Sequence, residues 1–171
     1  MFLFKSRYTS DKLIHSIINL EQNIVLKSID KYTKDVIIDK RVLFYAMACK
    51  KDLIVDYLLS FINDPNEILE ISIISSRLYY LLESVKNGAD VNKAFDLSPP
   101  YLVKESSILK YLLDNGLKED DGSIMFNSIN NYESMKLLID NGWTKGKQDA
   151  YSMCFIKKNI RMSKLLLESG F

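Results

Sequence analysis

The sequence predicts an all-α fold, a solenoid of about six stacked helix-turn-helix repeats. The first observation is a seven-residue phrase that occurs three times, at 110–116, 136–142 and 164–170. Each copy consists of a lysine, three apolar residues, an acid, a small polar residue and a glycine. Such a phrase is typical of an amphipathic helix that ends in a chain reversal at glycine.

The second observation is the spacing of these ends along the chain. The terminal glycines Gly88, Gly116, Gly142 and Gly170 are 28, 26 and 28 residues apart. Apolar residues also recur at the centre of each expected second helix: Leu58, Leu81, Leu112, Leu138 and Leu166. A period of this length holds two helices of about ten residues, and a pair of this size must bury its apolar face against neighbouring pairs.

The first two repeats are expected at roughly 11–40 and 41–64. Two short helices fit residues 11–30, and Asp11 can cap the first of them. A clearer pair follows within 41–62, whose second helix begins near Lys51. Helices this short need a packing neighbour to be stable.

The third repeat is expected at 65–96. Pro65 suits a first helical turn, so a helix over 66–74 should begin there. Its partner, over 76–87, ends at Gly88, where we expect a left-handed cap.

The last three repeats are expected at roughly 97–120, 121–146 and 147–171, within one domain that spans 1–171. The stretch 93–105 allows only a short first helix with a proline in its opening turn. Its partner should cover 106–115. Two further pairs are expected at 121–129 with 132–141 and at 147–157 with 160–169.

The stretch Asn87–Asn92, with the sequence Asn-Gly-Ala-Asp-Val-Asn, resembles the repeat-end phrase of the ankyrin-repeat family. The Leu-Leu-x-x-Gly endings resemble the same family, and Ser98-Pro99 stands where the family usually has Thr-Pro. The repeats are shorter than the family's usual length of about 33 residues and contain no Thr-Pro-Leu-His. They are similar to the degenerate ankyrin repeats of large viruses, phages and intracellular bacteria.

The composition narrows the class of function. A formal net charge of +1 argues against a strongly basic nucleic-acid binder, so we expect no nucleic-acid partner. Two distant cysteines and no signal-like or membrane-length apolar run favour the cytoplasm, which would be the host cytoplasm for a viral protein. Residues 143–171 carry six basic and two acidic residues, which makes either a solvated face or a contact for an acidic protein or nucleic acid.

Residues for catalysis are not found in a recognisable arrangement, and we expect no enzyme. His15 is the only histidine, and no two Cys or His residues have metal-ligand spacing. The acidic stretch 119–121 could be a metal site but is better explained as a loop tip before a helix. No cofactor, metal or small-molecule substrate is therefore expected.

The resemblance implies a protein-binding module whose partner lies on the concave face and the tips between repeats. The candidate contact residues are Tyr45, Phe95, Asp96, Lys118, Glu119, Asp120, Asn127, Trp143, Lys145 and Lys147. Trp143 has two interpretations: an interface anchor, or a ring that packs on the following helix pair.

The functional hypothesis is a non-catalytic module that binds, and sequesters or inhibits, a host or partner protein. The alternative is a structural subunit that self-associates through its C-terminal repeat, so both a monomer and a homo-oligomer are open. A third interpretation, an enzyme on an unusual helical scaffold, lacks the residues to support it.

Overall fold

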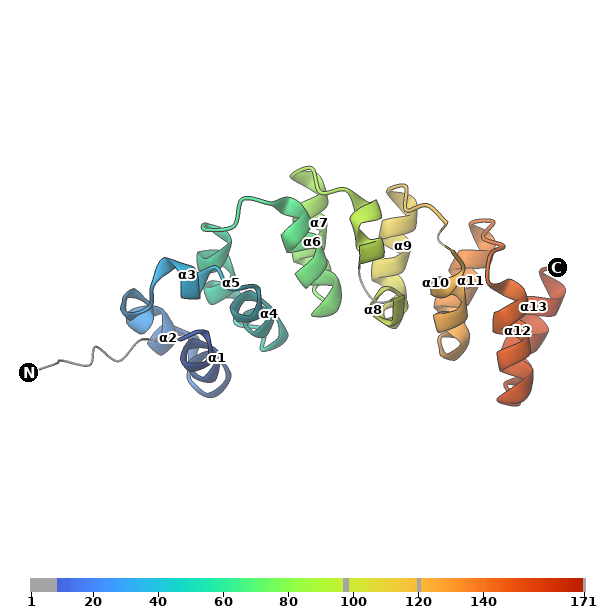
Figure 1. Cartoon of the computed structure of the whole chain (residues 1–171), viewed down its shortest axis with the longest axis horizontal. Coiled ribbons are helices and arrows are strands. Elements are labelled where there is room, and N and C mark those ends of the chain that lie inside the picture. Colours follow the sequence, from blue (N-terminus) through green and yellow to red (C-terminus); the bar gives the residue numbers. More distant parts are fainter. Residues whose placement is uncertain (1–8, 97–98, 120, 171) are drawn as a thin grey trace, which may run out of the picture. The chain divides into compact units, whose positions relative to one another are not determined.

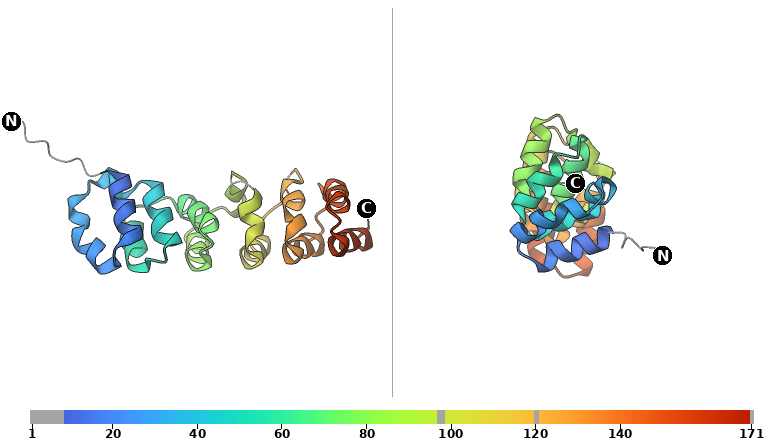
Figure 2. Two further views of the ribbon diagram at one scale, coloured as in Figure 1. Left: turned by 90° about the horizontal axis from the view of Figure 1, so that it is seen from below. Right: turned by 90° about the vertical axis from the view of Figure 1, so that its left-hand side faces the viewer.

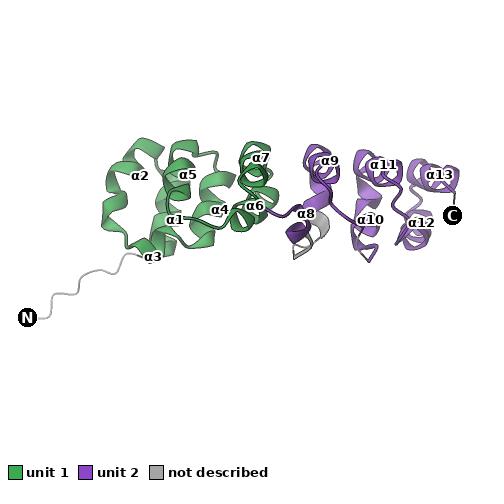
Figure 3. Cartoon of the chain, turned by 90° about the horizontal axis from the view of Figure 1, so that it is seen from above, with its two compact units in different colours: residues 1–88 green, residues 89–171 purple. Residues whose placement is uncertain are grey.

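The computed structural model describes residues 9–96, 99–119 and 121–170, and it describes no side chains at 95, 96, 99 and 100. About 73% of the chain is helical, and no strand occurs in the described ranges. The expected all-α class is therefore confirmed (Figure 1). The chain divides into two compact units, residues 1–88 and 89–171 (Figure 3).

The first unit contains three pairs of antiparallel helices with a short extra helix between the first two pairs. Its helices are α1 (Ser10–Asn19), α2 (Gln22–Ser28), α3 (Lys34–Ile37), α4 (Lys40–Ala48), α5 (Asp52–Leu59), α6 (Pro65–Ile74) and α7 (Leu78–Lys86), with a 3-10 turn at Ile29–Lys31. The first helices pack in one row, α1 on α4 and α4 on α6, and α2 packs on α5 in the other row (Figure 3).

The second unit repeats this arrangement. Its helices are α8 (Pro99–Lys104), α9 (Ser106–Asp114), α10 (Ser123–Asn127), α11 (Tyr132–Asp140), α12 (Lys147–Ile156) and α13 (Ile160–Glu168), with 3-10 turns at Val91–Asp96 and Ser128–Asn130. α8, α10 and α12 form one row, while α9 packs on α11 in the other (Figures 2 and 3). The expected helix pairs are confirmed to within a few residues at their ends.

From the second pair onward, the second helices α5, α7, α9, α11 and α13 begin at residues 52, 78, 106, 132 and 160, which gives intervals of 26, 28, 26 and 28. The central leucine of each is fully buried. These leucines therefore belong to the packing between helices, as the sequence predicted.

Side-chain caps set the start of several helices. Asp64 accepts a hydrogen bond from the Asn66 N–H, so α6 begins at Pro65. Asn131 and Asn159 accept from the N–H groups of Ser134 and Met162 at the starts of α11 and α13.

These two asparagines also join successive pairs. The Asn131 Nδ2 donates to the Val103 carbonyl at 2.7 Å, and the Asn159 Nδ2 donates to the Ile129 carbonyl at 3.0 Å. Each carbonyl lies near the end of the preceding pair's first helix, so one side chain caps its own helix and fixes the register of its neighbour.

The turn between paired helices was less predictable. It uses a left-handed residue that is not glycine at Lys50, Ser76 and Lys158, with φ of 55°, 56° and 56°. The next N–H bonds to the carbonyl five residues back in each case, as from Asn159 to Cys154 at 2.8 Å. The second helices α7, α9, α11 and α13 end at glycine instead, and Gly88 has φ +95°, which confirms the expected left-handed cap.

Candidate interaction surface

The loops that connect successive pairs in the second unit are held by side chains from the loop before. Asn92 Oδ1 accepts from the Lys118 N–H at 3.0 Å. One repeat later, Glu119 Oε1 accepts from the Lys145 N–H at 2.6 Å and from the Thr144 N–H. The backbone of each loop is thereby fixed, while the side chains of Lys118 and Lys145 stay exposed.

Hydrogen bonds from backbone N–H groups lower the pKa values of the acidic side chains in these loops. The pKa of Glu119 lies below its usual value, chiefly because the Lys145 N–H donates to the carboxylate. The pKa of Asp90 is lowered chiefly by the backbone N–H of Asn92, and that of Asp121 by the backbone N–H of Ser123. These bonds hold the acids in their charged form. Asp90 and Asp121 stay exposed, as do the side chains of Lys118 and Lys145.

Two of these loops approach backbone to backbone. A Cβ added to Gly122 would lie 2.5 Å from the Gly146 nitrogen, and one added to Gly146 would lie 2.3 Å from the Gly122 oxygen. Both glycines have positive φ, +103° and +74°. Only glycine fits at both places, and the two residues hold adjacent loops in direct contact.

Trp143 is only 5% exposed, so its ring lies in the core and is not presented at the surface as an anchor for a partner. Its backbone N–H closes the turn at Gly142 by donating to the Leu138 carbonyl at 3.0 Å. An apolar residue directly after a left-handed glycine cap commonly folds back onto the helix, and here the ring becomes part of the core.

Lys147 is also buried, at 9% exposed, and the prediction that it contacts a partner needs the same correction. Its Nζ donates to the Ser169 carbonyl at 3.0 Å. The ammonium group thus satisfies a carbonyl at the end of α13, where a positive charge is favourable. This lysine ties the start of α12 to the end of its partner helix.

Glu119 and Asn127 are half-buried and engaged within the fold. The Asn127 Nδ2 donates to the Ser123 carbonyl at 2.8 Å, one turn back in the same helix. Tyr45 is 36% exposed on α4, and its ring makes an edge contact with Phe44 at 5.2 Å between centroids. Asp120 and the side chains of Phe95 and Asp96 lie outside the described residues.

Of the predicted contact residues in the second unit, the structure leaves Lys118 and Lys145 exposed, one in each of two successive loops. We call these two lysines, together with Thr144, the loop edge. Tyr45 belongs to the first unit.

An ionic cluster in the first unit was not predicted. Arg77 pairs with Asp52, and the Tyr80 hydroxyl lies 3.3 Å from a carboxylate oxygen of Asp52 and of Asp56. Burial and the two carboxylates raise the pKa of Tyr80. The spacing of two aspartates four residues apart on α5 was the available signal, because it places both on one helix face.

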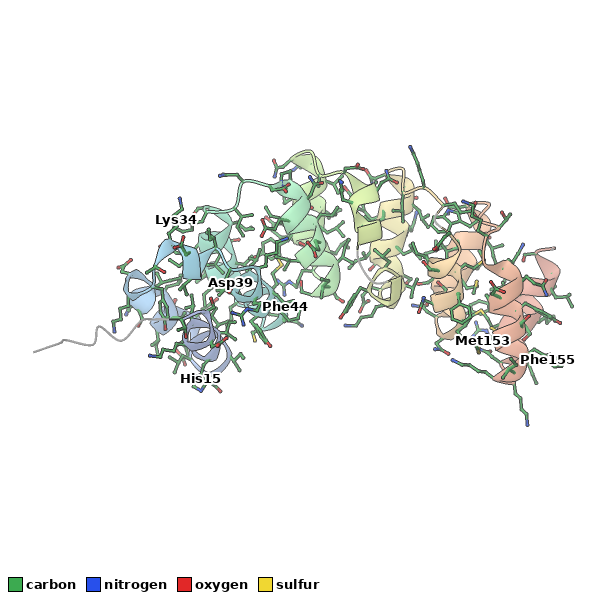
Figure 4. All side chains as sticks on the ribbon, viewed as in Figure 1. His15, Lys34, Asp39, Phe44, Met153 and Phe155 are labelled. Atoms are coloured by element: carbon green, nitrogen blue, oxygen red, sulfur yellow. The ribbon has the colours of Figure 1, made fainter. Side chains whose placement is uncertain are left out.

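Reactive groups are dispersed. His15 lies exposed on α1 (Figure 4), and burial raises the pKa of the Cys154 thiol. Within the described ranges, no group of three or more His, Cys, Asp or Glu side chains could hold a metal ion.

No helix in the part of the chain that the structure describes is both long and apolar enough to cross a membrane.

Comparison of the chain with protein families, with curated proteins and with solved structures finds no match. The likeness to ankyrin repeats therefore rests on the residues and spacings given above.

Proposed function

We propose that this chain is an ankyrin-like solenoid that binds another protein and has no catalytic chemistry of its own. The observation that carries the proposal is the loop edge. There, a side chain of one loop accepts a hydrogen bond from the backbone of the next loop, and the lysine whose N–H donates that bond has an exposed side chain. A pre-ordered surface loses little entropy when a partner binds, and this favours recognition through such an edge.

The solenoid itself is supported by three features. Second helices begin every 26 or 28 residues, and their central leucines are buried. The register asparagines Asn131 and Asn159 make the same two bonds in successive pairs. In a solenoid each pair packs on its neighbours along the chain, and the length of this chain accommodates six pairs.

The source and location belong to the same proposal. A composition rich in Ile, Lys and Asn and poor in Gly and Pro goes with AT-rich genomes, and the degenerate repeats are similar to those of viruses and phages. The function that fits is sequestration of a host protein in the host cytoplasm.

The experiment compares two matched double variants. Lys118→Gln/Lys145→Gln neutralises the loop edge, and Lys110→Gln/Lys136→Gln neutralises two exposed lysines of α9 and α11 in the same unit. Each tagged protein is used to capture partners from host-cell extract, with quantitative mass spectrometry. Loss of the captured proteins in the first variant alone supports the loop edge, and equal capture by both variants overturns it.

A second candidate is a structural subunit that self-associates through α12 and α13. Exposed apolar side chains on these helices, among them Phe155 and Leu167, favour it. Light scattering over a range of concentrations tests it, because a constant monomer mass excludes self-association.

A further inference from the structure

The outer face of the α12/α13 pair is more exposed than the equivalent positions of the other two pairs in the second unit. Counting from the residue before each second helix, the eighth residue is Leu113 in α9, which is 9% exposed, and Ile139 in α11, which is half-buried. In α13 the eighth residue is Leu167, and it is 56% exposed.

The first helices of the second unit show the same change. The residue that lies four positions before the second helix is Leu102 in one pair and Ser128 in the next, each 0% exposed. In the last pair it is Ile156, which is 71% exposed. Phe155 is also 71% exposed and lies on the side of α12 turned away from α10, whereas Met153 lies on the side that faces α10 (Figure 4). Since α10 covers α8 and α11 covers α9, this face is the one on which a further helix pair would stack.

A groove runs along this face. It has a volume of about 560 Å³ and is lined by Tyr151, Cys154 and Phe155 of α12 and by Ile160 and Leu167 of α13. Ile160 is 81% exposed, the highest fraction for a large apolar side chain in the described residues. Apolar exposure concentrated in one place marks an interaction site more clearly than scattered single residues do.

The rim of the groove is basic. Lys158 and Lys164 line it, and Lys157 is exposed in the same turn. Glu168, the one acid on α13, pairs with Lys164 at 3.7 Å. Arg161 is held back over the Tyr132 ring at 3.8 Å. The unit's last pair thus offers an apolar floor with cationic edges, which is complementary to an apolar segment flanked by acids.

The charges at the rim favour a different protein over a second copy of this chain as the occupant of the groove. Two copies joined through the same groove would bring the same lysines together. The exposed apolar residues of the first pair, Ile18 and Ile24, are accompanied by Asp11, Lys12, Glu21 and Lys27, in equal numbers of either sign. Neither the groove nor the first helix pair of a second copy would place an excess of acidic side chains against the lysines at the rim.

We propose that the groove between α12 and α13 binds an acidic amphipathic helix pair of a partner protein, which stacks on it as a further repeat would. The carbonyl that corresponds to Val103 and Ile129 in this pair is that of Lys157, so an asparagine at the start of the incoming second helix would have a matching acceptor. This site does not depend on the loop edge.

The test uses a synthetic, disulfide-closed helical hairpin of about 30 residues, with Leu and Ala on one face and Glu on the other. A second hairpin carries Lys in place of every Glu. Binding of each fluorescently labelled hairpin to the full chain is measured by anisotropy. The acidic hairpin is expected to bind at least about tenfold more tightly than the basic one, with a difference that shrinks at high salt.

Two variants locate the site. Phe155→Ser/Leu167→Ser should weaken binding of the acidic hairpin at least about tenfold, because both side chains leave the groove. Ile18→Ser/Ile24→Ser is the matched control on exposed apolar residues of α1 and α2, and it should bind unchanged. Thermal melts establish that all variants are folded.

Three outcomes overturn the proposal. They are equal binding of acidic and basic hairpins, binding insensitive to Phe155→Ser/Leu167→Ser, and a concentration-dependent dimer that the same variant abolishes. The last outcome would assign the groove to a second copy. Lys118→Gln/Lys145→Gln should leave hairpin binding intact, so failure at the loop edge and failure at the groove are distinguishable.

Discussion

Gly122 and Gly146 touch through their backbones: a Cβ on Gly146 would lie 2.3 Å from the Gly122 oxygen and 2.8 Å from its Cα. These residues are 24 positions apart and each precedes the first helix of its pair. The contact fixes how closely two successive loops approach, so it is a register device as well as a turn.

Substitution of Gly146 should therefore cost more than substitution of a glycine at which only φ matters. Gly142 is the matched control, because its φ is +76° against +74° for Gly146 and a Cβ there meets nothing within 4 Å. Gly142→Ala should cost about 1–2 kcal/mol from left-handed strain. Gly146→Ala should cost about 2 kcal/mol more, because a backbone contact must open. Urea unfolding measures both, and equal losses would contradict the contact.

Ser76 offers the opposite case, a substitution to glycine that should stabilise the protein. Its φ is +56°, and its Oγ is buried with no hydrogen-bond partner among the described residues. Ser76→Gly removes the strain and the unpaired hydroxyl, and the gain should exceed the added entropy of the unfolded chain. We expect a net stabilisation of about 1 kcal/mol, seen as a rise in melting temperature.

Lys50→Gly is the control for Ser76→Gly. Lys50 has nearly the same φ, 55°, but an exposed side chain. Its substitution should change stability by less than that of Ser76, because only the strain is relieved. A larger gain at Lys50 than at Ser76 would show that the buried hydroxyl contributes no penalty.

Asn159 should show two separable contributions. Its Oδ1 caps α13, and its Nδ2 donates to the Ile129 carbonyl of the preceding pair. Asn159→Ser keeps a capping oxygen and loses the bond between pairs, for which we expect a loss of about 1 kcal/mol. Asn159→Ala loses both and should cost about 2 kcal/mol. Chemical denaturation of the three proteins tests the order, and equal losses for Ser and Ala would assign the whole effect to the bond between pairs.

The sequence predicted the helix pairs well because their signals are local. A glycine at the end of an amphipathic phrase has few alternatives to a left-handed turn, and Gly88 takes that conformation. The short helix α3 was missed because four residues carry too little periodic pattern to be recognised.

The candidate site was harder to predict because its residues are decided by partners distant in sequence. Glu119 bonds to the backbone 25 and 26 residues later, and the Lys147 Nζ reaches a carbonyl 22 residues away. Trp143 could equally have faced solvent or core, and only packing settles this choice. Charged and aromatic residues at loop tips thus suggested contact, whereas several of them hold the repeats together.

Glu119 provides a prediction about pH. Its pKa is lowered in the folded protein, mainly by the N–H of Lys145, from the ordinary value of 4.5. A carboxylate with a depressed folded pKa contributes stability that is fully present above its unfolded pKa and is lost as the pH falls through the folded pKa. Glu119 should therefore stabilise the protein at neutral pH, and this contribution should fade below about pH 4.5.

The comparison is with Glu119→Gln, which keeps a neutral acceptor at the same position. At pH 7 the natural protein should be more stable by about 0.5–1 kcal/mol, a modest value because the carboxylate is partly exposed. The difference should shrink towards zero as the pH falls through the lowered folded pKa, because the protonated glutamate resembles the amide. Urea midpoints for both proteins across this range supply the measurement. A difference that stays constant with pH would mean that the bonds from Lys145 and Thr144 do not depend on the charge of Glu119.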